Sequence, residues 1–159
     1  LYIFDSGDYT RQVNLNNRKD SDESFTITLK KRKIYERNRI KYIIVGEGDN
    51  LVSLTRELGL FSWELKRYND LPDGYEVQPG EELYIQPKRN RPEAGYDFHY
   101  VKKGENMRSI SQLYGVKLKK LYRRNHMEPG TEPVEGQKIW LRKTMPRSEW
   151  KKLNTSDDK

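Results

Sequence analysis

The chain has 159 residues, of which 33% are hydrophobic and 35% charged, and its formal net charge is +7. A sequence this polar can bury only small cores, so we expect small domains and no single large one. The absence of cysteine excludes disulfides and thiolate metal sites, and two histidines are too few for a His-rich metal cluster. No hydrophobic run reaches membrane-spanning length and no signal peptide is present, and a start at Leu1 without methionine suggests a piece of a longer protein.

Residues 1–41 form a leader that is partly strand. Phe25–Leu29 alternates apolar and polar residues, which predicts a strand. The basic run Lys30–Lys33 lies between two strand-like stretches and is typical of a solvated turn. Ile34–Lys41 leads directly into the next segment, and we expect it to pack on that segment's edge.

Residues 42–87 predict a unit of the order strand, helix, helix, strand. The β-branched run Tyr42–Val45 suits a strand. Asn50 is a typical helix N-cap, and Gly59 is a typical left-handed helix end. A second short helix is expected to end at Asn69, because asparagine tolerates the left-handed conformation. The sequence Gln78–Glu81 then predicts a type II turn that opens the strand Glu82–Ile85.

Residues 98–143 repeat this unit at a constant offset of 56 positions, without a gap. The conserved residue types are mainly those that set turns and helix ends, so the repeat duplicates a backbone path. The predicted fold class is therefore α+β, with two tandem βααβ modules: module 1 (42–87) and module 2 (98–143). The identical pairs are Val45/Val101, Gly48/Gly104, Asn50/Asn106, Ser53/Ser109, Gly59/Gly115, Leu65/Leu121, Arg67/Arg123, Asn69/Asn125, Gly74/Gly130, Glu76/Glu132 and Gly80/Gly136.

The segments outside the modules are expected to be loosely organised. Residues 88–97 are polar and contain proline and glycine, which is typical of a linker. We therefore expect the two modules to fold independently and to move relative to each other. In the tail, residues 144–159, Ser148 could cap a short helix that carries Trp150 and Leu153.

The repeated unit resembles the LysM module, a βααβ domain that binds glycans containing N-acetylglucosamine. The resemblance covers residues 42–143. It departs from the usual pattern at the start of the first helix, where Asp49-Asn50 and Glu105-Asn106 replace the usual Asp-Thr, and at Pro133, where an aliphatic residue is common. The motif residues are Gly48, Asp49, Asn50, Leu51, Leu54, Gly59, Leu60, Leu65, Asn69 and Gly80–Ile85, and in the second copy Gly104, Glu105, Asn106, Met107, Ile110, Gly115, Val116, Leu121, Asn125 and Gly136–Leu141.

The resemblance also places a glycan-binding site. In LysM modules the sugar lies in a shallow groove between the loop after the first strand and the loop after the second helix. An exposed ring such as Tyr75 could stack on a sugar or anchor its own loop, and His126 is most simply a surface residue. The residues implied are Gly48, Asp49, Asn50, Leu51, Asn69, Asp70, Leu71, Tyr75 and Val77 in module 1, and Gly104, Glu105, Asn106, Met107, Asn125, His126 and Met127 in module 2.

The leader is similar to the segment that joins a glucosaminidase domain to C-terminal LysM repeats in Bacteroidetes-type cell-wall hydrolases. This similarity implies that the chain anchors a hydrolase to peptidoglycan or to another N-acetylglucosamine polymer such as chitin. It also implies a secreted or periplasmic, envelope-associated location. The catalytic residues of such a protein would lie upstream of Leu1.

Charge separates the two modules. Module 1 carries 3 basic and 9 acidic side chains, and module 2 carries 11 basic and 4 acidic ones. The basic surface of module 2 either keeps the domain soluble or attracts an anionic partner, which peptidoglycan is and chitin is not.

Two other function classes stay open. The fold could serve as a protein-interaction or assembly module of the envelope, or a basic helix could attract nucleic acid, although no specific nucleic-acid motif is present. Catalysis, a cofactor and a metal are not expected, because the sequence lacks the corresponding motifs. The oligomeric state stays open. The basic helix comprises Lys117, Lys119, Lys120, Arg123 and Arg124.

Overall fold

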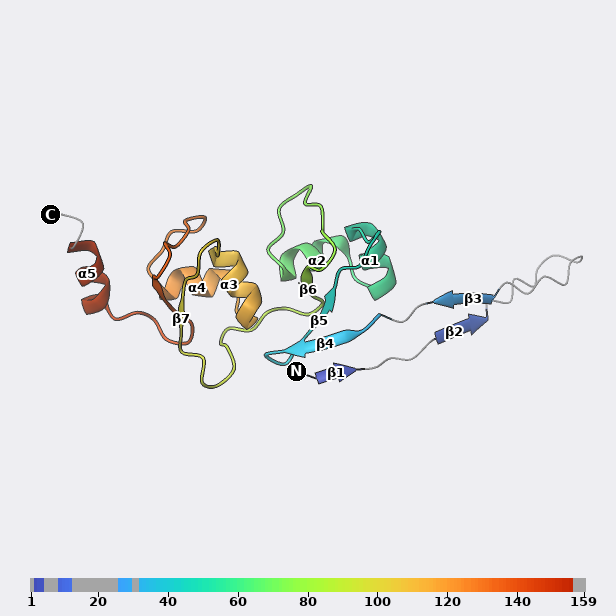
Figure 1. The fold of residues 1–159 in the computed structure, drawn as a ribbon, viewed down its shortest axis with the longest axis horizontal. Coiled ribbons are helices and arrows are strands. Elements are labelled where there is room, and N and C mark those ends of the chain that lie inside the picture. Colours follow the sequence, from blue (N-terminus) through green and yellow to red (C-terminus); the bar gives the residue numbers. More distant parts are fainter. Residues whose placement is uncertain (1, 5–8, 13–25, 30–31, 156–159) are drawn as a thin grey trace, which may run out of the picture.

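The structure is a computed structural model that describes residues 2–4, 9–12, 26–29 and 32–155. The two modules lie side by side along the long axis of the molecule (Figure 1). A two-stranded ribbon of β2 and β3 projects at one end, and helix α5 lies at the other. The elements of these flanks are β1 (Tyr2–Phe4), β2 (Tyr9–Gln12), β3 (Thr26–Leu29) and α5 (Arg147–Thr155).

Module 1 is built on an antiparallel sheet in the order β1-β4-β5-β6. The leader's expected strand is confirmed as β3, whereas Phe25, Lys30 and Lys31 lie outside the described residues. The expectation that Ile34–Lys41 packs on the module edge is also confirmed, because β4 and the start of β5 form a hairpin in which Tyr35 pairs with Tyr42. The strands of the module are β4 (Ile34–Arg37), β5 (Ile40–Ile44) and β6 (Glu82–Tyr84).

The helices of both modules begin and end where the repeat predicts. Asn50 caps α1 by accepting a hydrogen bond from the Ser53 backbone N–H at 2.8 Å, and Gly59 ends that helix at φ 67°. The second copy repeats both features. The remaining elements are α1 (Leu51–Leu58), α2 (Ser62–Tyr68), β7 (Phe98–Tyr100), α3 (Met107–Tyr114), α4 (Leu118–Arg124) and β8 (Lys138–Trp140).

Two local expectations are wrong. The left-handed residues after α2 and α4 are Asp70 (φ 51°) and His126 (φ 52°), one position later than the asparagines that precede them. Ser148 lies inside α5 and does not cap it, because the Pro146 carbonyl accepts the first amides of that helix. Proline is well suited to that position, since it has no N–H that the helix would leave unsatisfied.

Each module has its own small apolar core between its helices and its strands. The core of module 1 centres on Ile43, Leu54, Leu65 and Leu83, all of them fully buried. The core of module 2 is composed of the equivalent region of the second copy, including Met107, Ile110, Val116, Leu121 and Ile139. Burial of these side chains drives folding, at about 25 cal/mol for each Å² of apolar surface removed from water.

The first residues of the segment between the modules are packed against them, whereas residues 93–97 are exposed, and the expected independent motion of the modules stays a prediction. Lys88 is only 4% exposed, and Pro92 is also buried. Arg89 forms a parallel bridge with Val116 of module 2. The Arg89 N–H donates to the Gly115 carbonyl at 3.0 Å, and the Lys117 N–H donates to the Arg89 carbonyl at 2.8 Å. Residues 88 and 89 therefore extend along module 2, with Arg89 hydrogen-bonded to its backbone.

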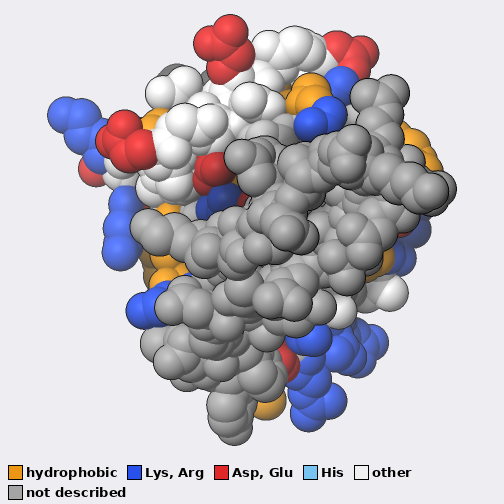
Figure 2. Space-filling model, turned by 90° about the vertical axis from the view of Figure 1, so that its right-hand side faces the viewer, with side chains coloured by type: hydrophobic (Ala, Val, Ile, Leu, Met, Phe, Trp, Pro, Cys, Tyr) orange, Lys and Arg blue, Asp and Glu red, His pale blue; other side chains and the backbone are white. Residues whose placement is uncertain are grey.

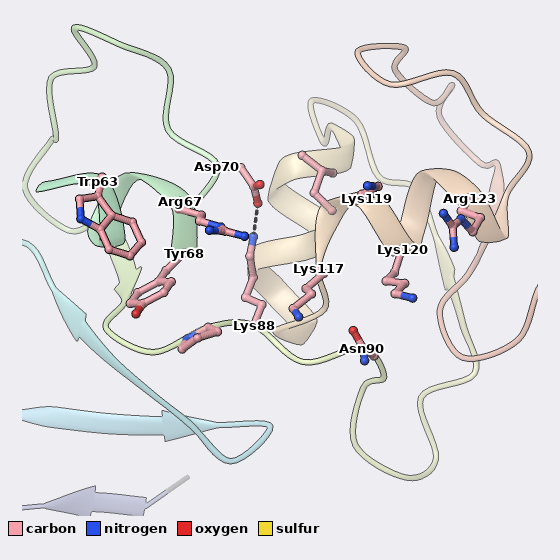
Figure 3. Close-up of a pocket in the computed structure, with 12 residues that line it drawn as sticks. Trp63, Arg67, Tyr68, Asp70, Lys88, Asn90, Lys117, Lys119, Lys120 and Arg123 are labelled. Atoms are coloured by element: carbon pink, nitrogen blue, oxygen red, sulfur yellow. Dashed lines mark hydrogen bonds and ion pairs between the residues drawn. The ribbon is translucent and has the colours of Figure 1, made fainter. Parts of the chain in front are cut away.

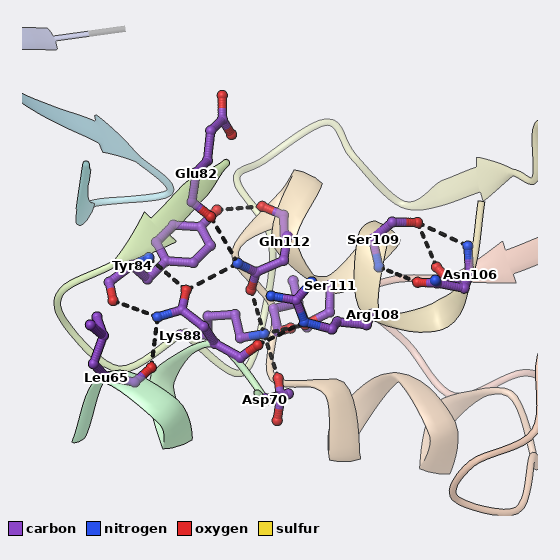
Figure 4. A network of polar contacts seen from close by, with 12 residues as sticks. Leu65, Asp70, Glu82, Tyr84, Lys88, Asn106, Arg108, Ser109, Ser111 and Gln112 are labelled. Atoms are coloured by element: carbon purple, nitrogen blue, oxygen red, sulfur yellow. Dashed lines mark hydrogen bonds and ion pairs between the residues drawn. The ribbon is translucent and has the colours of Figure 1, made fainter. Parts of the chain in front are cut away.

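A polar network joins the two modules (Figure 4). The Lys88 ammonium donates to Asp70 of module 1 at 2.6 Å and to Ser111 and Gln112 of module 2 at 2.7 and 2.8 Å. Burial lowers the pKa of Lys88, although Asp70 acts in the opposite direction. The Gln112 amide in turn donates to the Asn69 side chain at 3.0 Å. Buried polar groups that satisfy one another in this way fix a unique arrangement.

Candidate functional site

The acidic residue of each first loop folds back onto its own backbone. An Asp49 oxygen accepts the Gly46 N–H at 2.7 Å and lies 2.8 Å from Arg32. Glu105 repeats this geometry with the Lys102 N–H at 2.8 Å and the His99 ring at 2.7 Å.

These contacts keep both acids ionised. Partial burial acts to raise the pKa of each carboxyl, but the hydrogen bonds from Arg32 and Gly46 lower the pKa of Asp49. Those from Lys102 and His99 lower the pKa of Glu105. The two carboxylates therefore stabilise the conformation of their loops, and an ionised carboxylate cannot donate a proton.

The asparagines of the first loops are used by the helices that follow. Asn50 and Asn106 accept from the backbone N–H groups of Ser53 and Ser109 at 2.8 and 2.7 Å. The glycines before them, Gly48 and Gly104, have φ angles of 78° and 83°, which side chains other than glycine rarely adopt. These loops can therefore offer a ligand mainly their backbone.

The asparagines of the second loops hold the module together. Asn69 is fully buried. Its side-chain NH₂ donates to the Leu65 and Tyr84 carbonyls at 2.9 and 2.8 Å, and its side-chain oxygen accepts from the Tyr84 N–H at 2.6 Å. Asn125 makes the same three bonds with Leu121 and Trp140. Each side chain ties a helix end to the last strand of its module and lies inside the fold, away from any groove.

The next residues of the second loops point elsewhere. The Asp70 carboxylate pairs with Lys88 at the module junction. His126 is exposed, and its Nε2 lies 2.8 Å from the Met145 carbonyl of the tail. His126 thus fastens the tail to module 2, and its ring lies 5.9 Å from that of Trp150 in α5.

In module 1 the structure brings the remaining predicted residues together. Leu51 of the first loop and Leu71, Tyr75 and Val77 of the second loop belong to one apolar cluster. The Tyr75 hydroxyl donates to Glu81 at 2.8 Å, which favours the role of a loop anchor over that of a free stacking ring. Between the two loops, the half-buried Leu51 leaves part of its surface open to solvent.

Module 2 differs at the equivalent place. Met107 is fully buried where Leu51 is half-buried, and Met127 packs against the same core. The Met107 N–H donates to the Glu132 carboxylate at 2.8 Å, so a side chain of the second loop bridges to the first. Among the hydrogen bonds of the described residues, none joins Leu51 to Glu76, the equivalent pair in module 1. The two loops of module 2 are therefore bridged by a hydrogen bond within the chain.

Two residues of α3 that were not predicted from the sequence contact module 1. The Arg108 guanidinium donates to the Asn69 carbonyl at 2.9 Å and lies 5.7 Å from the Tyr75 ring. The Gln112 side-chain amide donates to the Asn69 side chain, and the Gln112 backbone carbonyl accepts a hydrogen bond from the Tyr84 hydroxyl at 2.5 Å. The available signal was the difference between the copies, because the matching positions of α1 carry Val52 and Arg56.

Two further properties concern the described residues only. Their helices do not include one that is both long and apolar enough to cross a membrane. Within the same ranges, no group of three or more His, Asp or Glu side chains is arranged to hold a metal ion.

The chain is similar to solved structures and to one domain family. The solved structures similar to the chain include those of the spore cortex-lytic enzyme SleL from Bacillus cereus and from Bacillus megaterium QM B1551. They are 26% and 17% identical to it, cover 67% and 66% of it, and both give a TM-score of 0.28. The chain spans 23% of the length of each of them. No curated protein matches the chain. The LysM domain profile matches residues 43–86 and 99–142, more than half of the sequence, and the chain therefore belongs to the LysM domain family.

Proposed function

We propose that this chain binds glycans that contain N-acetylglucosamine, either peptidoglycan or chitin-type oligomers, without cleaving them. LysM domains are non-catalytic modules that bind such polymers. The observation that carries the proposal is the pairing, in each of two in-register LysM modules, of two loops over one apolar cluster. The low pKa of Asp49 and of Glu105 supports the non-catalytic part, because a glycosidase acid needs a raised pKa.

Module 1 is the stronger candidate for the principal groove. An acetamido group needs a backbone N–H, a backbone C=O and a small apolar surface for its methyl group. The first loop of module 1 ends at the half-buried Leu51, opposite Leu71 and Val77 of the second loop. In module 2 the matching amide is already bonded to Glu132. We therefore assign most of the affinity to module 1.

We further propose that the chain anchors a cell-wall hydrolase to its substrate. LysM domains are typically extracellular or associated with the cell wall. A non-catalytic module raises the local concentration of an attached catalytic domain at an insoluble polymer, even when the affinity of each groove is weak. The catalytic domain would belong to another part of the protein.

The experiment is retention of the 159-residue chain on purified insoluble peptidoglycan and on chitin, beside a gel-shift assay with double-stranded DNA. We expect retention on at least one glycan, with dissociation constants roughly between micromolar and millimolar, because a shallow groove buries little apolar surface. Failure to bind both glycans would refute the proposal. If the chain binds DNA as tightly as it binds the glycans, the binding is a non-specific attraction between opposite charges and the proposal fails.

The assignment to module 1 has its own test. Glu132→Ala frees the Met107 amide, so affinity for an N-acetylglucosamine hexamer should rise, as measured by isothermal titration calorimetry. Glu135→Ala, which removes the same charge from an exposed position nearby, is the control and should leave the affinity unchanged. An unchanged affinity in Glu132→Ala would mean that the bridge does not close the second groove.

A further inference from the structure

A hollow of about 660 Å³ lies at the junction of the modules, between α2 of module 1 and α4 of module 2 (Figure 3). Of the predicted groove residues, only Asp70 reaches it. Trp63, Arg67 and Tyr68 line one side, and the packed segment around Lys88 forms the floor. The other side is formed by Lys117, Leu118, Lys119, Lys120 and Arg123.

A second hollow of about 920 Å³ adjoins the first and shares Asn90, Lys117 and Lys120 with it. Together the two hollows form one surface, here called the basic channel. Its two acids are already engaged, Asp70 with Lys88 and Glu93 with the Asn38 N–H at 3.0 Å. Its eleven cationic residues are Arg39, Arg67, Lys88, Arg89, Arg91, Lys117, Lys119, Lys120, Arg123, Arg124 and Arg142.

Most of these cations form no ion pair with the described residues. Within the described part of the chain, none of Arg67, Lys117, Lys119, Lys120 and Arg123 forms an ion pair. Arg124 is different, because its guanidinium donates to the Leu141 carbonyl inside module 2 at 2.6 Å. Unpaired cations that line a hollow raise the local concentration of anions.

The basic channel includes a cation even from module 1, which is acidic overall. Module 1 has only three basic residues against nine acidic ones, yet one of the three, Arg67, lines the channel. The end-on view of Figure 2, from the side of β2 and β3, shows acidic side chains mainly along the upper edge and basic ones at the left edge and more densely at the lower right. A uniformly solubilising distribution would intersperse the two signs.

An exposed aromatic pair lies at the module 1 end of the channel. Trp63 is 55% exposed, and its ring stacks on that of Phe61 at a centroid distance of 6.3 Å and an interplanar angle of 9°. Flat exposed rings of this kind can cover the apolar face of a sugar ring. The channel thus combines a surface for a pyranose with a row of positive charges.

We propose that the basic channel binds the carboxylate-bearing part of a glycan strand, as found in the stem peptides of peptidoglycan. This inference rests on the proposed function and adds a second, charge-selective contact outside the two grooves. An uncharged chitin oligomer would leave the cations of the channel unpaired. Because the network around Lys88 joins Asp70 of module 1 to α3 of module 2, the channel is preformed and its cations need little reordering when the ligand binds.

The test compares two triple variants of the chain that lose the same charge. The channel variant is Arg67→Gln, Lys119→Gln and Arg123→Gln, all exposed side chains. The control variant is Lys143→Gln, Arg147→Gln and Lys151→Gln, which are also exposed and lie outside both hollows. Circular dichroism and thermal unfolding check that both variants fold.

Binding is measured on insoluble peptidoglycan and with an N-acetylglucosamine hexamer. We expect the channel variant to bind peptidoglycan about tenfold more weakly, since each exposed charge contact contributes modestly. Its affinity for the uncharged hexamer should not change, and the control variant should stay within about twofold on both ligands. Raising the salt concentration should narrow the gap between the variants on peptidoglycan.

If both triple variants bind peptidoglycan equally weakly, or if neither binds more weakly than the unmodified chain, the channel proposal is wrong. Neither result would bear on glycan binding in the grooves. Failure of the unmodified chain to bind either glycan would instead refute the proposed function. If single-stranded DNA binds the unmodified chain more tightly than peptidoglycan does and loses most affinity in the channel variant, the channel serves nucleic acid and the proposal is wrong.

Discussion

Single residues at equivalent positions of the two modules reveal which side chains belong to the fold. Asn69 and Asn125 make the same three internal hydrogen bonds, and Asp49 and Glu105 close the same loop onto a backbone N–H. Sequence reasoning identified all four positions but could not assign their role. A residue required by the backbone path and one that binds the ligand give the same signal in a single sequence.

At Glu105 the fold makes stability depend on pH. Its folded-state pKa lies below the usual value, so the ionised carboxylate stabilises the fold above the unfolded-state pKa of about 4.3, and this contribution is lost as pH falls through the folded pKa. Glu105→Gln should therefore unfold at lower urea concentration than the unmodified chain at pH 7, with the difference shrinking below about pH 4. The exposed Glu135→Gln serves as the control. A difference that persists at pH 2 would contradict this account.

At the scale of helices and strands, the duplication made the prediction accurate. Every predicted helix of the two modules is present, because capping asparagines and left-handed glycines specify helix ends locally. The errors arose where a helix end depends on distant contacts. Asn69 does not adopt the left-handed conformation, since its side chain must reach Tyr84, and Asp70 adopts that conformation in its place.

The two helix-ending glycines allow a matched test at this scale. Gly59 and Gly115 have nearly the same φ, 67° and 65°, but an added Cβ would meet nothing within 4 Å at Gly59. At Gly115 it would lie 3.0 Å from Ile40 and 3.3 Å from the Tyr84 hydroxyl of module 1. Gly59→Ala should cost about 1–2 kcal/mol from backbone strain. Gly115→Ala should cost more, as measured by urea unfolding. Equal losses would mean that module 1 does not press on α3.

For the molecule as a whole, the packing of one module against the other is the feature that the sequence did not predict. The segment 88–97 has the composition of a linker, yet Lys88 is buried and bonded to both modules. The composition of a segment indicates whether it can be exposed to solvent. It does not indicate that Ser111 and Gln112 of another helix will bind that segment. The basic channel depends on the same packing, since it draws side chains from both modules.

Distance measurements between the modules test this packing. The chain lacks cysteine, so spin labels can be attached at Val52→Cys and Lys143→Cys, both exposed. Double electron–electron resonance should give one narrow distance distribution. Gln112→Ala should broaden it by weakening the junction, whereas Gln78→Ala, at an exposed turn, should not. A broad distance distribution in the labelled chain without further substitutions would mean that the modules move relative to each other through a mobile linker.

Binding of N-acetylglucosamine glycans in the loop grooves can be measured by an NMR titration of the isotope-labelled chain with an N-acetylglucosamine hexamer. We expect saturable shifts in the backbone amides of residues 48–51 and 71–77, with smaller shifts at 104–107 and 127–134. The amides of α4 should stay in place, because the hexamer carries no charge for the basic channel. The absence of saturable shifts, or shifts confined to residues 117–124, would contradict binding in the grooves.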